Sequence, residues 1–286
     1  MSYTYVMNNF VVIIFATWRV FMTRSISKSL SGILQDLELE RPLLVTIEML
    51  SNLRDKYGLS SPVKTIAYRL KKNGWLLPTD RKGVWEFVPA EVAGVYSSYD
   101  PLLYFRSFLA KYPDIICGLT YQTAAWLYGE SNRIPSRIDI SIQDSKRSRL
   151  LIRHASVSVY KPRLPYQNIS NIPVLSRESV IVHMVSKPSS VPSWANVPEW
   201  LPDFCADISI DNAFIELKDR PQSVAQRFAY LIQVVRPDIS NEIIRRRPPK
   251  NTAWFGDRKQ ALRFDSIHMV ADSLLPFDPK KVGEKI

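Results

Sequence analysis

The stretch Ser61–Gly74 (SPVKTIAYRLKKNG) decides how the N-terminal third of the chain folds. Four of its apolar residues recur at steps of three and four, which places them on one face of a helix. They are Val63, Ile66, Ala67 and Leu70. Ser61 can cap the helix, Pro62 suits its first turn, and Gly74 suits the position just past its end. The pattern therefore predicts a helix from Pro62 to Asn73 that packs on its neighbours through one face.

The elements around this helix predict a winged helix-turn-helix. Upstream, apolar residues at helical spacing predict one helix from Thr23 to Leu37 and a second from Leu44 to Tyr57. Downstream, the aromatic and β-branched runs Trp75–Leu77 and Val84–Val88 enclose a turn that Gly83 closes, which is typical of a β-hairpin. Three helices followed by a hairpin is the order of a winged helix-turn-helix.

The face of the helix opposite its apolar residues carries cations and hydroxyls and no carboxylate. Cations suit phosphates, whereas hydroxyls suit phosphates or base edges. Arg81 and Lys82 lie at the hairpin tip, where a wing would contact the DNA backbone or the minor groove. Ordinary solvation can also produce a Lys-rich helix face. The predicted DNA-binding residues are Ser61, Lys64, Thr65, Tyr68, Arg69, Lys71, Lys72, Arg81 and Lys82.

The charge of the chain favours a polyanionic partner. The 286 residues carry 38 Lys and Arg against 27 Asp and Glu, a formal net charge of +11. Eight cations and two anions lie between Arg54 and Lys82, so this short span holds +6 of that charge. Proteins this basic usually bind nucleic acid or an acidic membrane surface, although charge can serve solubility alone.

A larger mixed α/β domain is predicted over residues 101–286, after a linker at residues 91–100. Its predicted helices are Pro101–Tyr112, Thr120–Tyr128, Arg177–Ser186 and Ser223–Val235. Its predicted strands are Ile115–Cys117, Arg137–Ile142, Leu150–Arg153 and Ser156–Tyr160. Lys187–Pro202, rich in Pro and Ser, is predicted to be a surface excursion, while Trp254–Phe255 and Ile267–Met269 add strand or packing segments. The expected fold class is α+β, with the winged helix-turn-helix over residues 22–90 ahead of the larger domain.

The first 21 residues contain a separate apolar run, Val11–Trp18 (VVIIFATW). It is well short of the roughly 18–20 residues that cross a bilayer, so no membrane partner is expected. No Lys or Arg precedes it, unlike a secretory signal. We expect residues 1–21 to be a dispensable extension and the working chain to start at Met22. The alternative is that the run packs as a terminal strand or helix.

Two segments resemble the AbiEi-family antitoxins. Gly83–Pro89 (GVWEFVP), together with the residues from Leu44 onward, is similar to the N-terminal winged domain of that family. Gly118–Gly129 (GLTYQTAAWLYG) is similar to the Gly-Leu-x-x-x-x-Ala-Ala-x-x-x-Gly pattern that opens its C-terminal domain. Tyr128 stands where the family often has His. The resemblance extends over roughly Met22 to Pro276.

The resemblance implies a transcriptional autorepressor that binds inverted repeats in the double-stranded DNA of its own promoter. It also implies that the protein counteracts a co-encoded nucleotidyltransferase-like toxin, directly or indirectly, and that both domains offer basic surface. Residues 133–163 carry eight cations against Asp139 and Asp144, although a solvated surface explains this equally well. The possible secondary DNA-binding residues are Arg147, Arg149, Arg153, Arg245, Arg246 and Arg247.

The sequence offers no recognisable catalytic or metal-binding set, so we expect no enzyme, no metal and no cofactor. The three His residues are far apart, and His183 lies in an apolar helix where a core imidazole is expected. Asp139-Ile140-Ser141 lacks the second carboxylate that a nucleotidyltransferase pair needs. The only two cysteines, Cys117 and Cys205, form no disulfide framework, which favours a reducing cytoplasm.

Two classes of function remain open from the sequence. The first is a DNA-binding antitoxin and transcriptional repressor. The alternative is a one-component regulator whose C-terminal domain senses a small molecule, or a nuclease-like enzyme with a winged targeting domain.

Overall fold

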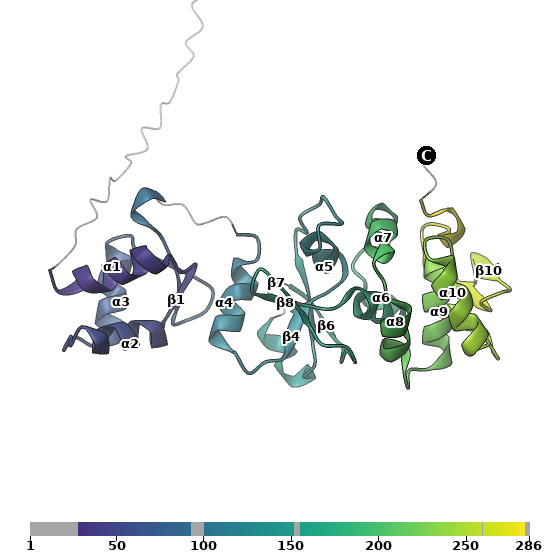
Figure 1. Ribbon diagram of the computed structural model, residues 1–286, viewed down its shortest axis with the longest axis horizontal. Coiled ribbons are helices and arrows are strands. Elements are labelled where there is room, and N and C mark those ends of the chain that lie inside the picture. Colours follow the sequence, from purple (N-terminus) through teal and green to yellow (C-terminus); the bar gives the residue numbers. More distant parts are fainter. Residues whose placement is uncertain (1–27, 93–99, 152–154, 259, 284–286) are drawn as a thin grey trace, which may run out of the picture. The chain divides into compact units, whose positions relative to one another are not determined.

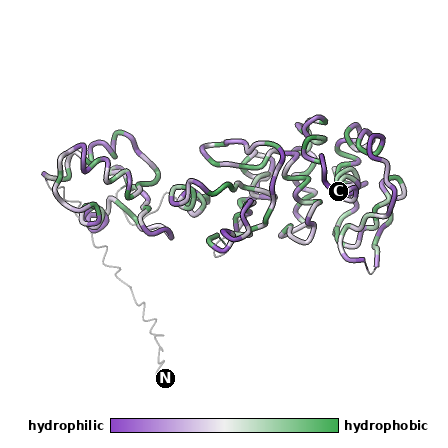
Figure 2. Tube along the Cα trace, turned by 90° about the horizontal axis from the view of Figure 1, so that it is seen from below, coloured by the Kyte–Doolittle hydropathy of each residue, from purple (hydrophilic) through white to green (hydrophobic). Residues whose placement is uncertain are grey.

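The computed structural model describes residues 28–92, 100–151, 155–258 and 260–283. The described chain divides into two compact units, with the boundary between Ser98 and Tyr99 (Figure 1). The expectations for residues 1–21 and for the start of the first helix at Thr23 lie outside the described residues, as does most of the expected linker. Apolar and polar stretches alternate along both units (Figure 2), and each unit has its own buried apolar cluster.

The first unit combines three α-helices with one small antiparallel sheet (Figure 1). Its sheet has the strand order β1-β3-β2. Its elements are a 3-10 turn at Lys28–Leu30, α1 (Ser31–Glu40), β1 (Leu44–Thr46), α2 (Ile47–Lys56), α3 (Val63–Lys72), β2 (Leu76–Pro78), β3 (Val84–Phe87) and a 3-10 turn at Ala90–Val92.

The second helix begins later than its sequence pattern predicts, because Leu44–Thr46 is strand β1. In the sheet, Leu44 lies opposite Glu86 and Val45 opposite Trp85. Val45 is fully buried there, and β-branched residues such as Val and Thr suit a paired, half-buried strand. Thr46 then ends the strand and caps α2, since its hydroxyl accepts a hydrogen bond from the Met49 amide at 3.2 Å.

The third helix and the hairpin are confirmed. Helix α3 runs from Val63 to Lys72, within one residue of its predicted ends, and β2 pairs with β3 as predicted. The predicted cap is wrong: Pro62 holds the N-cap position, with an extended ψ of 142°, and no side chain bonds to the helix start. Ser61 therefore lies one residue too early to cap this helix.

The second unit is built around a five-stranded mixed sheet with the order β6-β5-β4-β8-β7. The β5–β6 and β4–β8 pairs are parallel, whereas β4–β5 and β7–β8 are antiparallel. The mixed α+β class is therefore confirmed. The strands are β4 (Cys117–Leu119), β5 (Ile138–Ile142), β6 (Ala155–Val159), β7 (Gln167–Ile169) and β8 (Ile172–Val174).

Seven α-helices and a second sheet complete the described part of this unit (Figure 1). The helices are α4 (Leu103–Lys111), α5 (Tyr121–Leu127), α6 (Arg177–Ser186), α7 (Val197–Ala206), α8 (Ile210–Leu217), α9 (Gln222–Ile232) and α10 (Pro237–Arg246). The second sheet has the order β10-β11-β9 and consists of β9 (Ala253–Phe255), β10 (Arg263–Asp265) and β11 (Val270–Asp272). Short 3-10 turns occupy Ser145–Leu150, Pro188–Ser190 and Pro279–Lys281.

Helix α6 is the central helix of this unit and has its predicted bounds. Eight consecutive residues of it, from Glu178 to Val185, are buried, because α5, α8 and α9 all pack against it. Apolar residues therefore lie on every side of α6, whereas those of α3 lie on one side only. None of the helices in the described residues is long and apolar enough to span a membrane.

Three predictions in the second unit are wrong. The strand predicted at Ile115–Cys117 begins only at Cys117 and runs to Leu119. No strand begins at Leu150: that residue ends a 3-10 helix whose first turn Asp144 caps, through a 2.8 Å bond from the Lys146 amide. Lys187–Pro202 is no surface excursion, because it contains the start of α7 and the buried Trp194 and Trp200. Its Pro and Ser residues fall largely ahead of the helix, where they form the turn.

Candidate nucleic-acid interface

Helix α3 separates its apolar and cationic residues onto opposite faces. Ile66, Ala67 and Leu70 are at most 4% exposed and belong to the core of the first unit. The side chains of Lys64, Tyr68, Arg69, Lys71 and Lys72 are exposed, whereas Ser61 and Thr65 are half-buried. The structure thus brings seven of the nine predicted residues together. Six lie on α3, and Ser61 directly precedes the N-cap residue Pro62.

Tyr68 is the unusual member of this exposed face. Its side chain is 64% exposed, although an aromatic ring buries more apolar area than most side chains when it packs inside a protein. Its neighbours along the helix surface are cations, Lys64 and Lys72, one turn away on either side. An exposed aromatic ring with a hydroxyl, set among cations, can contact both phosphates and bases.

The hairpin tip is held in one conformation by Thr79. The Thr79 hydroxyl accepts from the Arg81 amide at 3.1 Å and donates to the Val84 carbonyl at 2.8 Å. Gly83 has a φ of 87°, in the left-handed region that favours glycine, and its carbonyl accepts from the Ile47 amide at 3.0 Å. The tip that carries Arg81 and Lys82 is therefore fixed to the start of α2.

The structure reduces the number of cations that the first unit can offer to an anion. Arg54 pairs with Asp55 at 2.6 Å and Lys56 pairs with Asp36 at 2.7 Å; the Lys56 bond lowers the pKa of Asp36. Among the described residues, five predicted contact cations form no ion pair. They are Lys64, Arg69, Lys71, Lys72 and Lys82. The local charge excess is therefore concentrated on α3 and the hairpin tip.

The possible secondary DNA-binding residues differ in their exposure and in their ion pairs. Arg147 is exposed and 3.6 Å from Asp144, and Arg149 is exposed on the same 3-10 helix, while Arg153 lies outside the described residues. Arg245 and Arg246 both pair with Glu242 at 2.5 Å, near the end of α10. These pairs leave the two guanidinium groups exposed and partly neutralised.

Arg247 has a structural role that its sequence context does not reveal. Its guanidinium donates to the Leu217 carbonyl and to the Arg220 carbonyl, both at 2.9 Å. Leu217 is the last residue of α8, whereas Arg220 lies in the turn between α8 and α9. Arg247 therefore joins the end of α10 to the end of α8 and to the turn that follows it.

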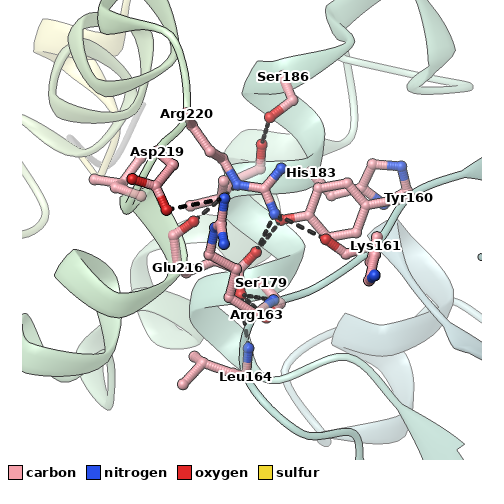
Figure 3. A network of polar contacts seen from close by, with 12 residues as sticks. Tyr160, Lys161, Arg163, Leu164, Ser179, His183, Ser186, Glu216, Asp219 and Arg220 are labelled. Carbon is pink, nitrogen blue, oxygen red and sulfur yellow. Dashed lines mark hydrogen bonds and ion pairs between the residues drawn. The ribbon is translucent and has the colours of Figure 1, made fainter.

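A buried polar network connects several segments of the second unit (Figure 3). Glu216 on α8 is fully buried and accepts hydrogen bonds from the Tyr160 hydroxyl, the Ser179 hydroxyl, the Arg220 guanidinium and the amides of Arg163 and Leu164. Burial, and then the Glu216 charge, raise the pKa of Tyr160. One carboxylate thus holds α6, α8 and the segment after β6 together.

His183 is next to this network and is a core imidazole, as predicted. It is fully buried on α6, its ring stacks on Tyr160 with the centroids 4.2 Å apart, and the hydroxyls of Thr120, Tyr121 and Ser158 lie within 3.0 Å of its nitrogens. Burial lowers the pKa of His183 to about 3. The imidazole is therefore neutral at physiological pH.

Asp139 on β5 has no second carboxylate at the neighbouring positions of Ser141 and Ser156. It is 3% exposed, accepts from the Thr123 amide and hydroxyl at 3.4 and 3.2 Å, and burial raises its pKa to about 7. The neighbouring positions in the sheet carry hydroxyls: Ser141 on the same strand, and Ser156 opposite Asp139 on β6. In the described residues, no three His, Cys, Asp or Glu side chains group to hold a metal.

Sequence reasoning missed the Glu216 network, although one signal was available. Glu216 stands among apolar residues on α8 (IDNAFIEL), between the buried Ala213 and Leu217. A carboxylate on an apolar helix face needs a buried partner, and Arg220 one turn later supplies it. Tyr160 and Ser179 could not be assigned, because they come from distant parts of the chain.

Comparison with known proteins identifies a family model that matches part of the second unit. Residues 116–234 match the family model of the AbiEi antitoxin C-terminal domain, which confirms the resemblance to AbiEi-family antitoxins. The fold is similar to the crystal structure of the RV2827C protein from Mycobacterium tuberculosis, with a TM-score of 0.71 and 25% sequence identity, over 88% of this chain and 94% of that chain. No curated protein matches the sequence.

Proposed function

From the AbiEi antitoxin domain at residues 116–234 we infer that this protein is an antitoxin that also represses its own promoter. We propose that its first unit is a winged helix-turn-helix, in which α3 enters the major groove and the β2–β3 hairpin is the wing. The DNA ligand is a set of inverted repeats in the promoter. The protein acts in the cytoplasm against a co-encoded nucleotidyltransferase-like toxin.

The observation that carries the DNA-binding proposal is the exposed face of α3. An α-helix fits the major groove of B-DNA, and this helix presents Lys64, Tyr68 and Lys72 on successive turns of one side. Its other side is buried in the core. The helix is therefore held rigidly while its cations face solvent.

The hairpin supports the same proposal, in which α3 enters the major groove and the hairpin is the wing. In winged domains the hairpin contacts the DNA backbone beside the groove that the helix occupies. Here Lys82 is exposed at a tip that Thr79 and Gly83 hold in one conformation. A rigid cationic tip can bind phosphate with little loss of conformational entropy.

Replacement of α3 residues is expected to separate sequence reading from backbone binding. Tyr68→Ala or Thr65→Ala should weaken binding to the operator by about tenfold or more and binding to random DNA much less, because base contacts carry sequence information. Lys82→Ala should weaken binding to both DNAs by a similar factor, because phosphates are the same in every sequence. Fluorescence anisotropy with the two duplexes measures both affinities.

Lys111→Ala is the matched control, since Lys111 is an exposed lysine on α4 in the second unit. It should leave both affinities unchanged. Equal losses on operator and random DNA for Tyr68→Ala and Thr65→Ala would show that α3 is not the element that reads sequence.

The second unit is proposed to counteract the toxin without the first. It has its own core, which includes α6, α9 and the five-stranded sheet. A fragment from Val95 to Ile286 is therefore expected to fold alone, to protect cells that express the toxin, and to leave the promoter unrepressed. Growth of the co-expressing strain and a promoter reporter measure the two activities.

The full-length chain with Tyr68→Ala is the complementary control, because it keeps the second unit and weakens only operator binding. It should protect cells as the fragment does. A soluble fragment that fails to protect cells, while the full-length chain succeeds, would contradict this division of function.

A further inference from the structure

Gly32 in the first turn of α1 leaves room for the ring of Tyr57, which directly follows α2. A Cβ atom on residue 32 would lie 2.5 Å from Cε1 and 2.7 Å from Cδ1 of that ring. Atoms cannot approach so closely, so any other residue at this position would displace the ring. Glycine is a poor helix former, and here its lack of a side chain lets the Tyr57 ring pack directly on the backbone of α1.

Polar groups join the same two elements. Lys56, the last residue of α2, pairs with Asp36 of α1 at 2.7 Å, and its ammonium nitrogen lies 5.4 Å from the centroid of the Tyr57 ring. Burial, and then a hydrogen bond to Asp36, raise the pKa of Tyr57. Tyr57 is nevertheless 37% exposed and lies outside the buried cluster of the first unit. The Tyr57 contact therefore fastens the end of α2 at the surface, and the core does not depend on it.

The chain leaves α2 through a tight turn directly after Tyr57. The Leu59 amide donates to the Arg54 carbonyl at 3.0 Å. The Gly58 amide donates to the Asp55 carbonyl at 3.1 Å. This pair of bonds is a Schellman motif, in which Gly58 adopts the left-handed conformation with a φ of 60°. The turn therefore couples the position of the end of α2 to the direction in which the chain continues to α3.

The opposite end of α2 is joined to the wing tip. The Ile47 amide, at the start of α2, donates to the carbonyl of Gly83 at 3.0 Å, beside Lys82. Helix α2 thus connects the two elements that are proposed to bind DNA, with the wing tip at its start and α3 after its end. The N-terminal residues of a recognition helix contact base edges, and Lys64 and Thr65 hold this position in α3. A shift of the end of α2 would move these residues relative to the wing.

We propose that Tyr57 is a positioning residue for DNA reading: by packing on Gly32, it fixes where α3 begins relative to the wing. The inference rests on the proposed function and adds to it a residue outside the set that contacts DNA. Contacts to base edges need a defined geometry, whereas a long, flexible lysine side chain can follow a phosphate when the helix shifts. Loss of the Tyr57 contact therefore weakens sequence-specific binding more than non-specific binding.

Fluorescence anisotropy with operator and random duplexes tests this role. Tyr57→Ala should weaken operator binding by about tenfold, the equivalent of one base contact, and random-DNA binding by about twofold or less. Tyr57→Phe keeps the ring on Gly32 and should bind both duplexes as the wild type does. Gly32→Ala displaces the ring and should reproduce the effect of Tyr57→Ala. Because the two replacements act on one contact, the double variant should bind no more weakly than either single variant.

Leu39→Ala is the matched control, since Leu39 is 76% exposed on the same helix as Gly32. It should leave both affinities unchanged. Thermal melting of each variant establishes that the first unit is folded at the temperature of the binding assay. A loss of affinity then reports on the position of α3 and not on unfolding.

Amide hydrogen exchange tests the turn in the absence of DNA. In Tyr57→Ala the Leu59 amide should exchange about fivefold faster, because its bond to Arg54 opens more often when the end of α2 is loose. In Tyr57→Phe it should exchange at the wild-type rate. Unchanged exchange or unchanged operator affinity in Tyr57→Ala, an equal loss on random DNA, or a Tyr57→Phe variant as weak as Tyr57→Ala would each overturn the proposal.

The two measurements separate this proposal from the proposed function. A wild-type chain that binds operator and random DNA equally would contradict the proposed function. A wild-type chain that prefers the operator, together with Tyr57→Ala that keeps this preference, would overturn only the role of Tyr57.

Discussion

Raising the salt concentration from about 50 to about 200 mM is expected to weaken binding to the promoter by about a thousandfold. The reason is the number of cations on the proposed interface: Lys64, Arg69, Lys71, Lys72 and Lys82 are exposed and Arg81 is half-buried. Each cation that neutralises a phosphate releases a counterion, so six contacts give a slope of about −5 in a plot of log affinity against log salt.

Variants of the same interface make this expectation quantitative. The double variant Lys71→Ala, Lys72→Ala should reduce the slope by about 2, because two phosphate contacts are lost. Tyr68→Ala should lower operator affinity and leave the slope unchanged, because the phenol carries no charge. Titrations of one operator duplex at four or more salt concentrations measure these slopes. A slope near zero, or one that Tyr68→Ala changes as much as the double Lys variant, would contradict the proposed interface.

Replacing Glu216 is expected to have the largest effect on stability. Glu216→Ala should lower the free energy of unfolding of the second unit by about 3–5 kcal/mol, because it leaves the Arg220 guanidinium without its carboxylate in a buried site. The Tyr160 and Ser179 hydroxyls and the amides of the segment after β6 also lose their acceptor. At about 2–4 °C per kcal/mol, the melting temperature should fall by roughly 10 °C.

Glu199→Ala is the control for this variant. Glu199 pairs with Arg133 at 2.9 Å, and both side chains are at least half exposed. Removing an exposed pair of this kind should change the free energy of unfolding by about 0.5 kcal/mol or less. Thermal and urea unfolding of the two variants under identical conditions give the comparison. Similar small effects of both replacements would mean that the network around Glu216 contributes little to stability.

The sequence predicted most accurately where the structure depends on local spacing. The two faces of α3, the β2–β3 hairpin and the bounds of α6 follow from the order of side chains within about a dozen residues. Segments whose structure depends on a distant partner were predicted less well. Leu44–Thr46 has an acceptable helical pattern by itself, and it becomes a strand because Val84–Phe87, some forty residues later, offers it a sheet edge.

For the candidate nucleic-acid interface, too, some properties follow from the local sequence and others depend on the tertiary structure. The amino-acid sequence by itself determined that α3 is amphipathic and basic, since helical periodicity assigns each side chain to a face. Only the tertiary structure decided which cations are available: Arg54 and Lys56 are paired, and Arg247 is engaged by the carbonyls of Leu217 and Arg220. Only the tertiary structure, likewise, joined Glu216 to Tyr160 and Ser179 and placed the Tyr57 ring on Gly32. The physical reason is that burial and ion pairing depend on groups far apart in the chain, whereas helical periodicity depends on neighbours.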